Sequence, residues 1–276
     1  MQPPLRTSHN PSFFLTRLIG HSLENRPLIL HYTPHFEAAP GGTLFIGGIH
    51  GDERATTLVL LSFLDRFQHL EHVDPSPTVA LGVLPLANPD GYLRNTRTNA
   101  RGVDLNRNFE TGWSAASEEP SGESPWSESE SRALRDLILC QRPQRIVTLH
   151  WALGELDADG PQSTPLAQTM WNALGEDQRT AYRLRVSGSP TVVPAPAVCP
   201  GSLGQWCGEG LRYPDGSAPA IVTLELPHAP HAPRPRALPA DHLERLRGVW
   251  KRDARGYLEA VEGPVHAMLW AACCEI

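Results

Sequence analysis

Two histidines and two acidic residues stand where apolar segments of the chain end. His50 closes the segment "TLFIGGIH", and Glu53 follows three positions later, where a helical pattern begins. The later segment "RIVTLH" ends at His150, and "IVTLELP" holds Glu225 among apolar neighbours. Two imidazoles and one carboxylate can hold Zn²⁺ and leave a fourth position for water. We therefore interpret His50, Glu53 and His150 as ligands of one zinc ion.

Glu225 is the remaining acidic residue of this set, and it suits a different task. Zinc lowers the pKa of a bound water molecule toward ~7 and polarises a carbonyl group. A carboxylate that is not a ligand must then accept the proton of the water and pass it to the leaving amine. Glu225 is our candidate for this general base and acid.

The apolar segments must form neighbouring strands for these side chains to meet. Residues 43–49, 78–88, 145–150 and 219–226 are predicted strands, and 55–70 and 131–143 are predicted helices. We also expect a β-hairpin over about 15–33 and a C-terminal helix over about 240–262. Segments 110–123 and 187–201 are predicted to be long surface loops.

Strands that alternate with helices and are apolar throughout indicate a mostly parallel sheet covered on both faces. We therefore predict a single α/β domain over residues 1–276, with a mixed, largely parallel twisted sheet. In open α/β sheets, ligands gather beyond the carboxyl ends of the strands. That edge is where the four candidate residues are expected to converge.

Composition excludes several other classes of protein. The chain has 276 residues, 40% of them hydrophobic and 20% charged, which is typical of a globular protein. A net charge of −6 argues against general binding to nucleic acid or to an anionic membrane surface. The start lacks a secretory signal and no apolar run reaches the roughly 20 residues of a membrane span, so we expect a cytoplasmic protein. The five cysteines do not indicate a disulfide scaffold: Cys140, Cys199, Cys207, Cys273 and Cys274.

Each candidate taken alone has a simpler interpretation. A single histidine at a strand end is most often structural, and Glu225 could be an ordinary paired carboxylate. Arg97, Arg101 and Arg107 could form a solvated basic face. The functional interpretation is favoured because all of these residues lie at the end of an apolar strand or in the loop that follows it.

Several motifs together resemble the zinc carboxypeptidase family of the carboxypeptidase A type. They are "HGDE", "NPDG", "RTNARGVDLNRNF", a later strand ending in His, and "TLELP". The resemblance implies the zinc ligands and the general base already named. It also implies that Arg97 stabilises the oxyanion and that Asn106 and Arg107 bind the terminal carboxylate of the substrate.

Within this family, "GSLGQWCGEGL" resembles the bacterial murein peptide amidase A branch. Those enzymes cleave the γ-D-glutamyl–meso-diaminopimelate bond of recycled cell-wall peptides in the cytoplasm. Ser202 in this stretch is either a substrate contact or a turn residue. Trp206 and Tyr213 are candidates for an aromatic side chain that closes over the substrate, and packing is the alternative for Trp206.

Two rival functions remain, besides a carboxypeptidase of other peptide specificity. The first is an N-acyl amino acid deacylase of the succinylglutamate desuccinylase or aspartoacylase type, which shares the ligand pattern. The "NPDG" turn favours the peptidase, because such deacylases usually lack it. The second is a non-catalytic peptide-binding protein, which the complete ligand set and Glu225 disfavour. The oligomeric state stays open.

Overall fold

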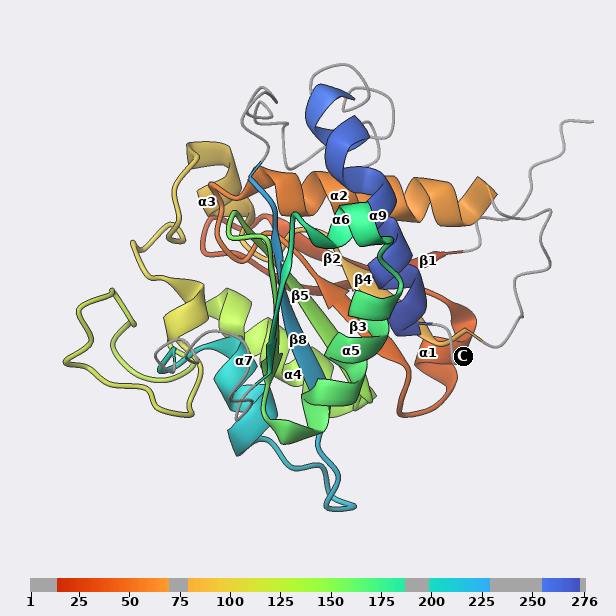
Figure 1. Ribbon diagram of the computed structural model, residues 1–276. Helices are drawn as coiled ribbons and strands as arrows, with labels where there is room; N and C mark the ends of the chain where they lie inside the picture. The colour runs from red at the N-terminus through yellow and green to blue at the C-terminus, as the bar shows by residue number, and fades with distance from the viewer. Residues whose placement is uncertain (1–13, 70–78, 187–198, 229–254, 274–276) are drawn as a thin grey trace, which may run out of the picture.

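The structure is a computed structural model, which describes residues 14–69, 79–186, 199–228 and 255–273. A mixed eight-stranded sheet runs through the molecule in the order β1-β2-β4-β3-β5-β8-β6-β7 (Figure 1). The strands are β1 (Leu15–His21), β2 (Pro27–Tyr32), β3 (Thr43–Ile46), β4 (Leu81–Leu84), β5 (Arg145–Trp151), β6 (Glu155–Asp159), β7 (Arg183–Val186) and β8 (Ala220–Leu226).

The four central strands, β4, β3, β5 and β8, are parallel, as the sequence predicts. The expected hairpin is present as the antiparallel pair β1–β2, which joins the sheet through β4. On the other side, β6 pairs antiparallel with β8, and β7 pairs parallel with β6. The α/β fold class with a mixed sheet is therefore confirmed, and the carboxyl ends of β3, β5 and β8 meet at one edge.

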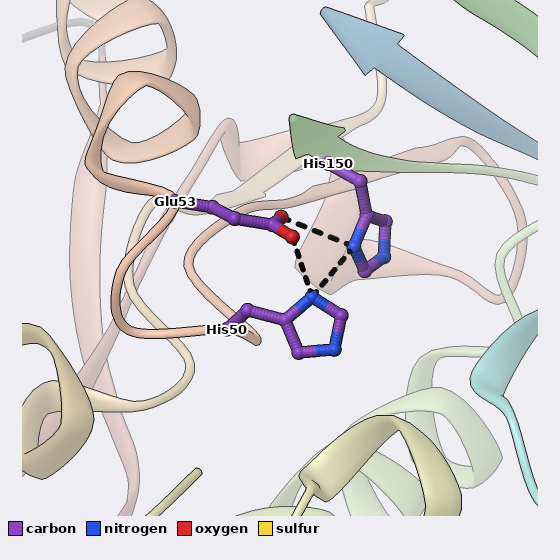
Figure 2. A group of neighbouring side chains, drawn as sticks. All are labelled: His50, Glu53 and His150. Atoms are coloured by element: carbon purple, nitrogen blue, oxygen red, sulfur yellow. Dashed lines mark hydrogen bonds and ion pairs between the residues drawn. The ribbon is translucent and has the colours of Figure 1, made fainter. Parts of the chain in front are cut away.

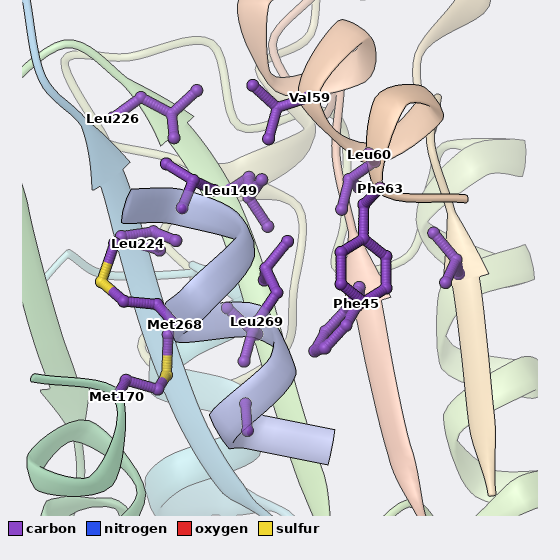
Figure 3. Packing of buried hydrophobic residues seen from close by; sticks show 14 of the residues in the cluster. Phe45, Val59, Leu60, Phe63, Leu149, Met170, Leu224, Leu226, Met268 and Leu269 are labelled. Atoms are coloured by element: carbon purple, nitrogen blue, oxygen red, sulfur yellow. The ribbon is translucent and has the colours of Figure 1, made fainter. Parts of the chain in front are cut away.

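One face of the sheet is covered by α2 (Arg54–His69), α5 (Thr164–Asn172) and α9 (Arg255–Cys273) (Figure 1). Side chains of these helices pack on the sheet in one apolar cluster, in which Leu269 of α9 lies near Leu224 of β8 and Phe45 of β3 (Figure 3). At about 25 cal/mol per Å² of buried apolar surface, this continuous cluster is a main source of stability.

The other face is covered by α1 (Pro34–Ala38), α4 (Ser129–Gln141) and the short helix α7 (Leu203–Gln205). The remaining helical segments are α3 (Pro89–Arg94), α6 (Glu176–Arg179), the 3₁₀ turns Leu105–Arg107 and Pro161–Ser163, and the π-helical turn Trp206–Gly210. Phe109, Trp126 and Trp206 contact one another beneath the surface on this side. This aromatic cluster supports the segments that follow the motif "DLNRNF".

The C-terminal helix differs from its predicted bounds of 240–262. It spans Arg255–Cys273, and residues 240–254 lie outside the described part of the chain. The helix continues through Gly263 and Pro264, which usually end or bend a helix. Val265, Met268 and other residues beyond them are buried against the sheet, so tertiary packing overrides the weak local helix propensity.

Candidate active site

The turn between β3 and α2 places the first two predicted ligands. His50 follows the buried strand β3, and the backbone N–H of Glu53 donates to the His50 carbonyl at 3.3 Å, which starts the turn into α2. Gly51 between them has no room for a side chain, because a Cβ there would lie 2.0 Å from the Gly91 carbonyl carbon. Close packing against α3 therefore fixes the direction of both side chains.

His50, Glu53 and His150 converge on one point, as the sequence predicts. Their ligand atoms all lie within 4.8 Å of one another, and all three side chains are buried. The two Nδ1 atoms are 3.2 Å apart, and Glu53 Oε1 and Oε2 lie 2.8 Å from His50 Nδ1 and 3.3 Å from His150 Nδ1 (Figure 2). Atoms bound about 2.0–2.1 Å from a tetrahedral ion lie about 3.3 Å from each other, so the group fits Zn²⁺.

Each ligand side chain makes a further hydrogen bond. His50 Nε2 lies 3.2 Å from Asp104 Oδ1, and Thr148 Oγ1 lies 3.3 Å from His150 Nε2. The backbone N–H of Trp151 donates to Glu53 Oε2 at 3.1 Å. Such outer contacts orient metal ligands and raise their basicity. Asp104 belongs to the motif "DLNRNF", and its place in the sequence alone indicated no role for it.

The buried acids determine the charge of the ligands. Burial opposes protonation of His50, but hydrogen bonds to Asp104 and Glu53 outweigh it and raise its pKa to about 9. Burial likewise disfavours charge on Glu53, yet its contacts with His150 and His50 lower its pKa to about 2. The pKa of Asp104 is also lowered, because His50, Arg97 and Arg107 outweigh the effect of its burial. The group of His50, Glu53 and His150 is therefore arranged to receive a cation.

Glu225 lies beside the ligands without joining them. It is directly opposite His150 in the parallel pairing of β5 with β8. Burial raises its pKa, aided by the charge of Glu53 and offset by His150 and by the backbone N–H of Leu153. Its Oε2 is buried and has no hydrogen-bond partner among the described residues. A carboxylate with a raised pKa and a free oxygen is suited to accept and return a proton.

Arg97 also lies next to the ligands. Its Nε donates to Asp104 Oδ2 at 2.8 Å, which orients the guanidinium. Its Nη1 is 3.3 Å from His50 Nδ1 and 3.7 Å from Glu53 Oε1, so the cationic end borders the ligand atoms. A fixed guanidinium in this place can stabilise negative charge that develops next to a metal ion.

Asn106 and Arg107 lie on the 3₁₀ turn that follows Asp104. The backbone N–H of Leu203 donates to Asn106 Oδ1 at 3.0 Å. The amide nitrogen of Asn106 therefore points away from Leu203 and can donate to another group. Arg107 donates from Nη1 to the Asn106 carbonyl at 2.8 Å and forms an ion pair with Glu119 through Nε. Arg101, in contrast, pairs with Glu128 away from these residues.

The three residues proposed from the stretch 201–213 have structural contacts. Ser202 Oγ accepts from the Gln205 N–H at 3.0 Å and so caps α7. Trp206 is buried in the aromatic cluster with Phe109, and Tyr213 donates from its hydroxyl to the Pro143 carbonyl at 2.9 Å. The capping role of Ser202 could have been predicted from the sequence, because Ser followed three residues later by Gln is typical of a helix start.

Comparison with known proteins gives a consistent result. The sequence pattern of the zinc carboxypeptidase family matches residues 6–152. Murein peptide amidase A of Escherichia coli K12 is 32% identical over 209 residues, which cover 70% of this chain and 76% of that protein. Murein peptide amidase A of Vibrio campbellii is 31% identical over 223 residues, which cover 75% and 77%.

Solved structures show the same fold. The crystal structure of murein-tripeptide amidase from Escherichia coli O157 is 25% identical, covers 91% of each chain and has a TM-score of 0.56. Thrombin-activatable fibrinolysis inhibitor has a TM-score of 0.63 at 19% identity, over 96% of this chain and 71% of that one. In the described part of this chain, every helix is too short or too polar to cross a membrane. The chain belongs to the zinc carboxypeptidase family and is a metallopeptidase hydrolase.

Proposed function

We propose that the protein hydrolyses a peptide amide next to a free carboxylate, with one zinc ion held by His50, Glu53 and His150. The observation that supports this most is the convergence of three ligand atoms within 4.8 Å, with Glu225 directly opposite His150 in the sheet. A histidine, a carboxylate and a second histidine with one open side are typical of a catalytic rather than a structural zinc site.

The residues around the ligands divide the work of hydrolysis. Zinc, when bound, supplies a Lewis acid that polarises the scissile carbonyl and makes a water molecule more acidic. Glu225 accepts the proton of the attacking water and returns it to the leaving amine. Arg97 donates to the oxygen that becomes negatively charged, and losing such a donor typically costs about 3 kcal/mol in the transition state.

Asn106 and Arg107 set the register of the substrate. A guanidinium matches a carboxylate through two parallel hydrogen bonds, and the amide nitrogen of Asn106 adds a further donor. A substrate anchored there by its free carboxylate places the neighbouring amide at the zinc ligands. Ser202 is a third candidate for substrate binding. It precedes Leu203, whose backbone N–H donates to Asn106 Oδ1, so it lies near the proposed carboxylate site.

The leading substrate is murein tripeptide, L-Ala-γ-D-Glu-meso-diaminopimelate, cleaved at the γ-D-glutamyl–diaminopimelate bond. Two relatives named murein peptide amidase A, each more than 30% identical over at least 70% of this chain, support this choice. Turnover of recycled cell-wall peptides would then take place in the cytoplasm.

Incubation of the zinc-loaded protein with this tripeptide tests the proposal. We expect free diaminopimelate and L-Ala-D-Glu, identified by mass, and no products from the His150→Ala variant. Parallel incubations use a tripeptide of ordinary α-linked residues and N-acetyl and N-succinyl amino acids. Turnover of the α-linked peptide alone would replace the murein substrate, and turnover of the N-acyl compounds alone would replace the peptidase by a deacylase.

A further inference from the structure

The proposed carboxylate-binding arginine already holds a carboxylate of this chain. Arg107 Nε forms an ion pair with Glu119, which belongs to the loop 110–123. The Arg107 side chain is only 12% exposed, whereas that of Glu119 is 46% exposed. Glu119 therefore reaches the guanidinium from the open side, from which a substrate would also approach.

The backbone of the loop is fixed where it carries Glu119. The next residue, Pro120, accepts from the Asp104 N–H at 2.8 Å. The carbonyl of Ser121 accepts from Asn108 Nδ2 at 2.8 Å and from Trp113 Nε1 at 3.0 Å. These bonds attach the loop to the same segment that carries Arg107, so the ion pair joins two anchored pieces of backbone.

An arginine fork binds one carboxylate well through two adjacent N–H groups. Nη1 of Arg107 donates to the Asn106 carbonyl and Nε faces Glu119, so an incoming carboxylate that binds the Nε side of the fork displaces Glu119. We infer that Glu119 is an internal competitor for Arg107 and sets the affinity of the site for carboxylate substrates. This inference rests on the proposed role of Arg107 in substrate binding.

The Glu119→Gln variant tests it, with Glu118→Gln as a matched control. Glu118 is the exposed neighbour in the same loop, so both variants remove one negative charge from nearly the same place. For the tripeptide, KM should fall about fivefold in Glu119→Gln, the size expected for loss of a partly exposed ion pair, with kcat unchanged. Glu118→Gln should leave KM and kcat as they are.

Chemical labelling tests the contact without any substrate. Phenylglyoxal reacts with accessible guanidinium groups, and mass spectrometry locates the label. Labelling of Arg107 should be faster in Glu119→Gln than in the parent or in Glu118→Gln, and acetate should protect it at a lower concentration.

Equal labelling in all three proteins, or none in any, would overturn the inference. A raised KM or a raised protecting acetate concentration in Glu119→Gln would overturn it too, because Glu119 would then position Arg107. If labelling responds as expected but no tripeptide is cleaved, the proposed function fails while the competition stands.

Discussion

The two faces of β5 and β8 differ in a way that separates stability from chemistry. Toward α2, α5 and α9, both strands stay apolar to their carboxyl ends, with Leu149, Leu224 and Leu226 buried. On the opposite face the same strands begin with Ile146 and Ile221 and then turn polar. Thr148 and His150, and Thr223 and Glu225, occupy that polar end in register.

Strand geometry makes this division possible, because successive side chains point to opposite faces. Alternate residues of one strand can therefore pack in the core, while the residues between them face the site. Stability and activity should therefore respond to different residues of one strand, even to adjacent ones.

Glu225→Gln should have the largest effect. The change removes the proton acceptor but keeps the size of the side chain, so kcat should fall about 10³-fold. Zinc content and the free energy of unfolding should be retained, because burial already disfavours the charge of this carboxylate. Steady-state kinetics, metal analysis and urea unfolding measure the three quantities. Undiminished turnover would remove Glu225 from the mechanism.

Leu224→Ala changes the adjacent residue on the other face. Leu224 is fully buried, so the free energy of unfolding should fall by about 2–5 kcal/mol. The folded protein should bind zinc with unchanged stoichiometry. Urea unfolding and metal analysis of the same sample check both statements. Loss of zinc from folded protein would show that the two faces are not separable.

Asp104→Asn tests the hydrogen bond behind His50. It keeps the shape of the side chain but removes the charge. Above about pH 9, where His50 is deprotonated in both proteins, zinc affinity should fall about 10- to 100-fold. Competition with a chelating dye measures this affinity. Asp52→Asn is the matched control, because Asp52 is an exposed acid beside Glu53 and should have little effect. Equal losses of zinc affinity in both variants would mean that the overall negative charge near the site, and not the contact of Asp104 with His50, determines the affinity.

The pH dependence of zinc binding should be the most graded effect. In the metal-free protein the pKa of His50 is raised to about 9, and zinc binds only the deprotonated ring. Apparent zinc affinity should therefore rise about tenfold per pH unit between about 6.5 and 9, then level off. In Asp104→Asn, the pH above which apparent zinc affinity stays constant should be lower. An unchanged midpoint would contradict the role of Asp104.

The convergence of the ligands was predictable because it depends on one general rule. Parallel strands end at the same edge, so His50 and His150, which close two such strands, must come close together. The partner of His50 was not predictable in the same way. Asp104 is 54 positions away along the chain, and only the path of the loop brings the two together.

The outer strand β6, unlike the hairpin β1–β2, escaped prediction for a local reason. Strand β6 has the sequence "ELDAD", and acidic residues are depleted in strands, so nothing local indicates a strand. It forms because Glu155 to Asp159 pair along β8. The bounds of α5 and α9 were also hard to predict, because these helices are stabilised by packing against each other and against the sheet.

Gly201 packs against the turn that carries Asn106 and Arg107, the residues proposed to bind the carboxylate of the substrate. A Cβ there would lie 2.5 Å from the Arg107 carbonyl, and its backbone bonds to Thr111 and Phe109. The segment 199–203 contacts Asn106 and Arg107, while the proposed zinc ligands are carried by β5 and the β3–α2 turn. Substitutions in this segment can therefore change which leaving group is recognised, while the residues proposed to hold zinc stay in place.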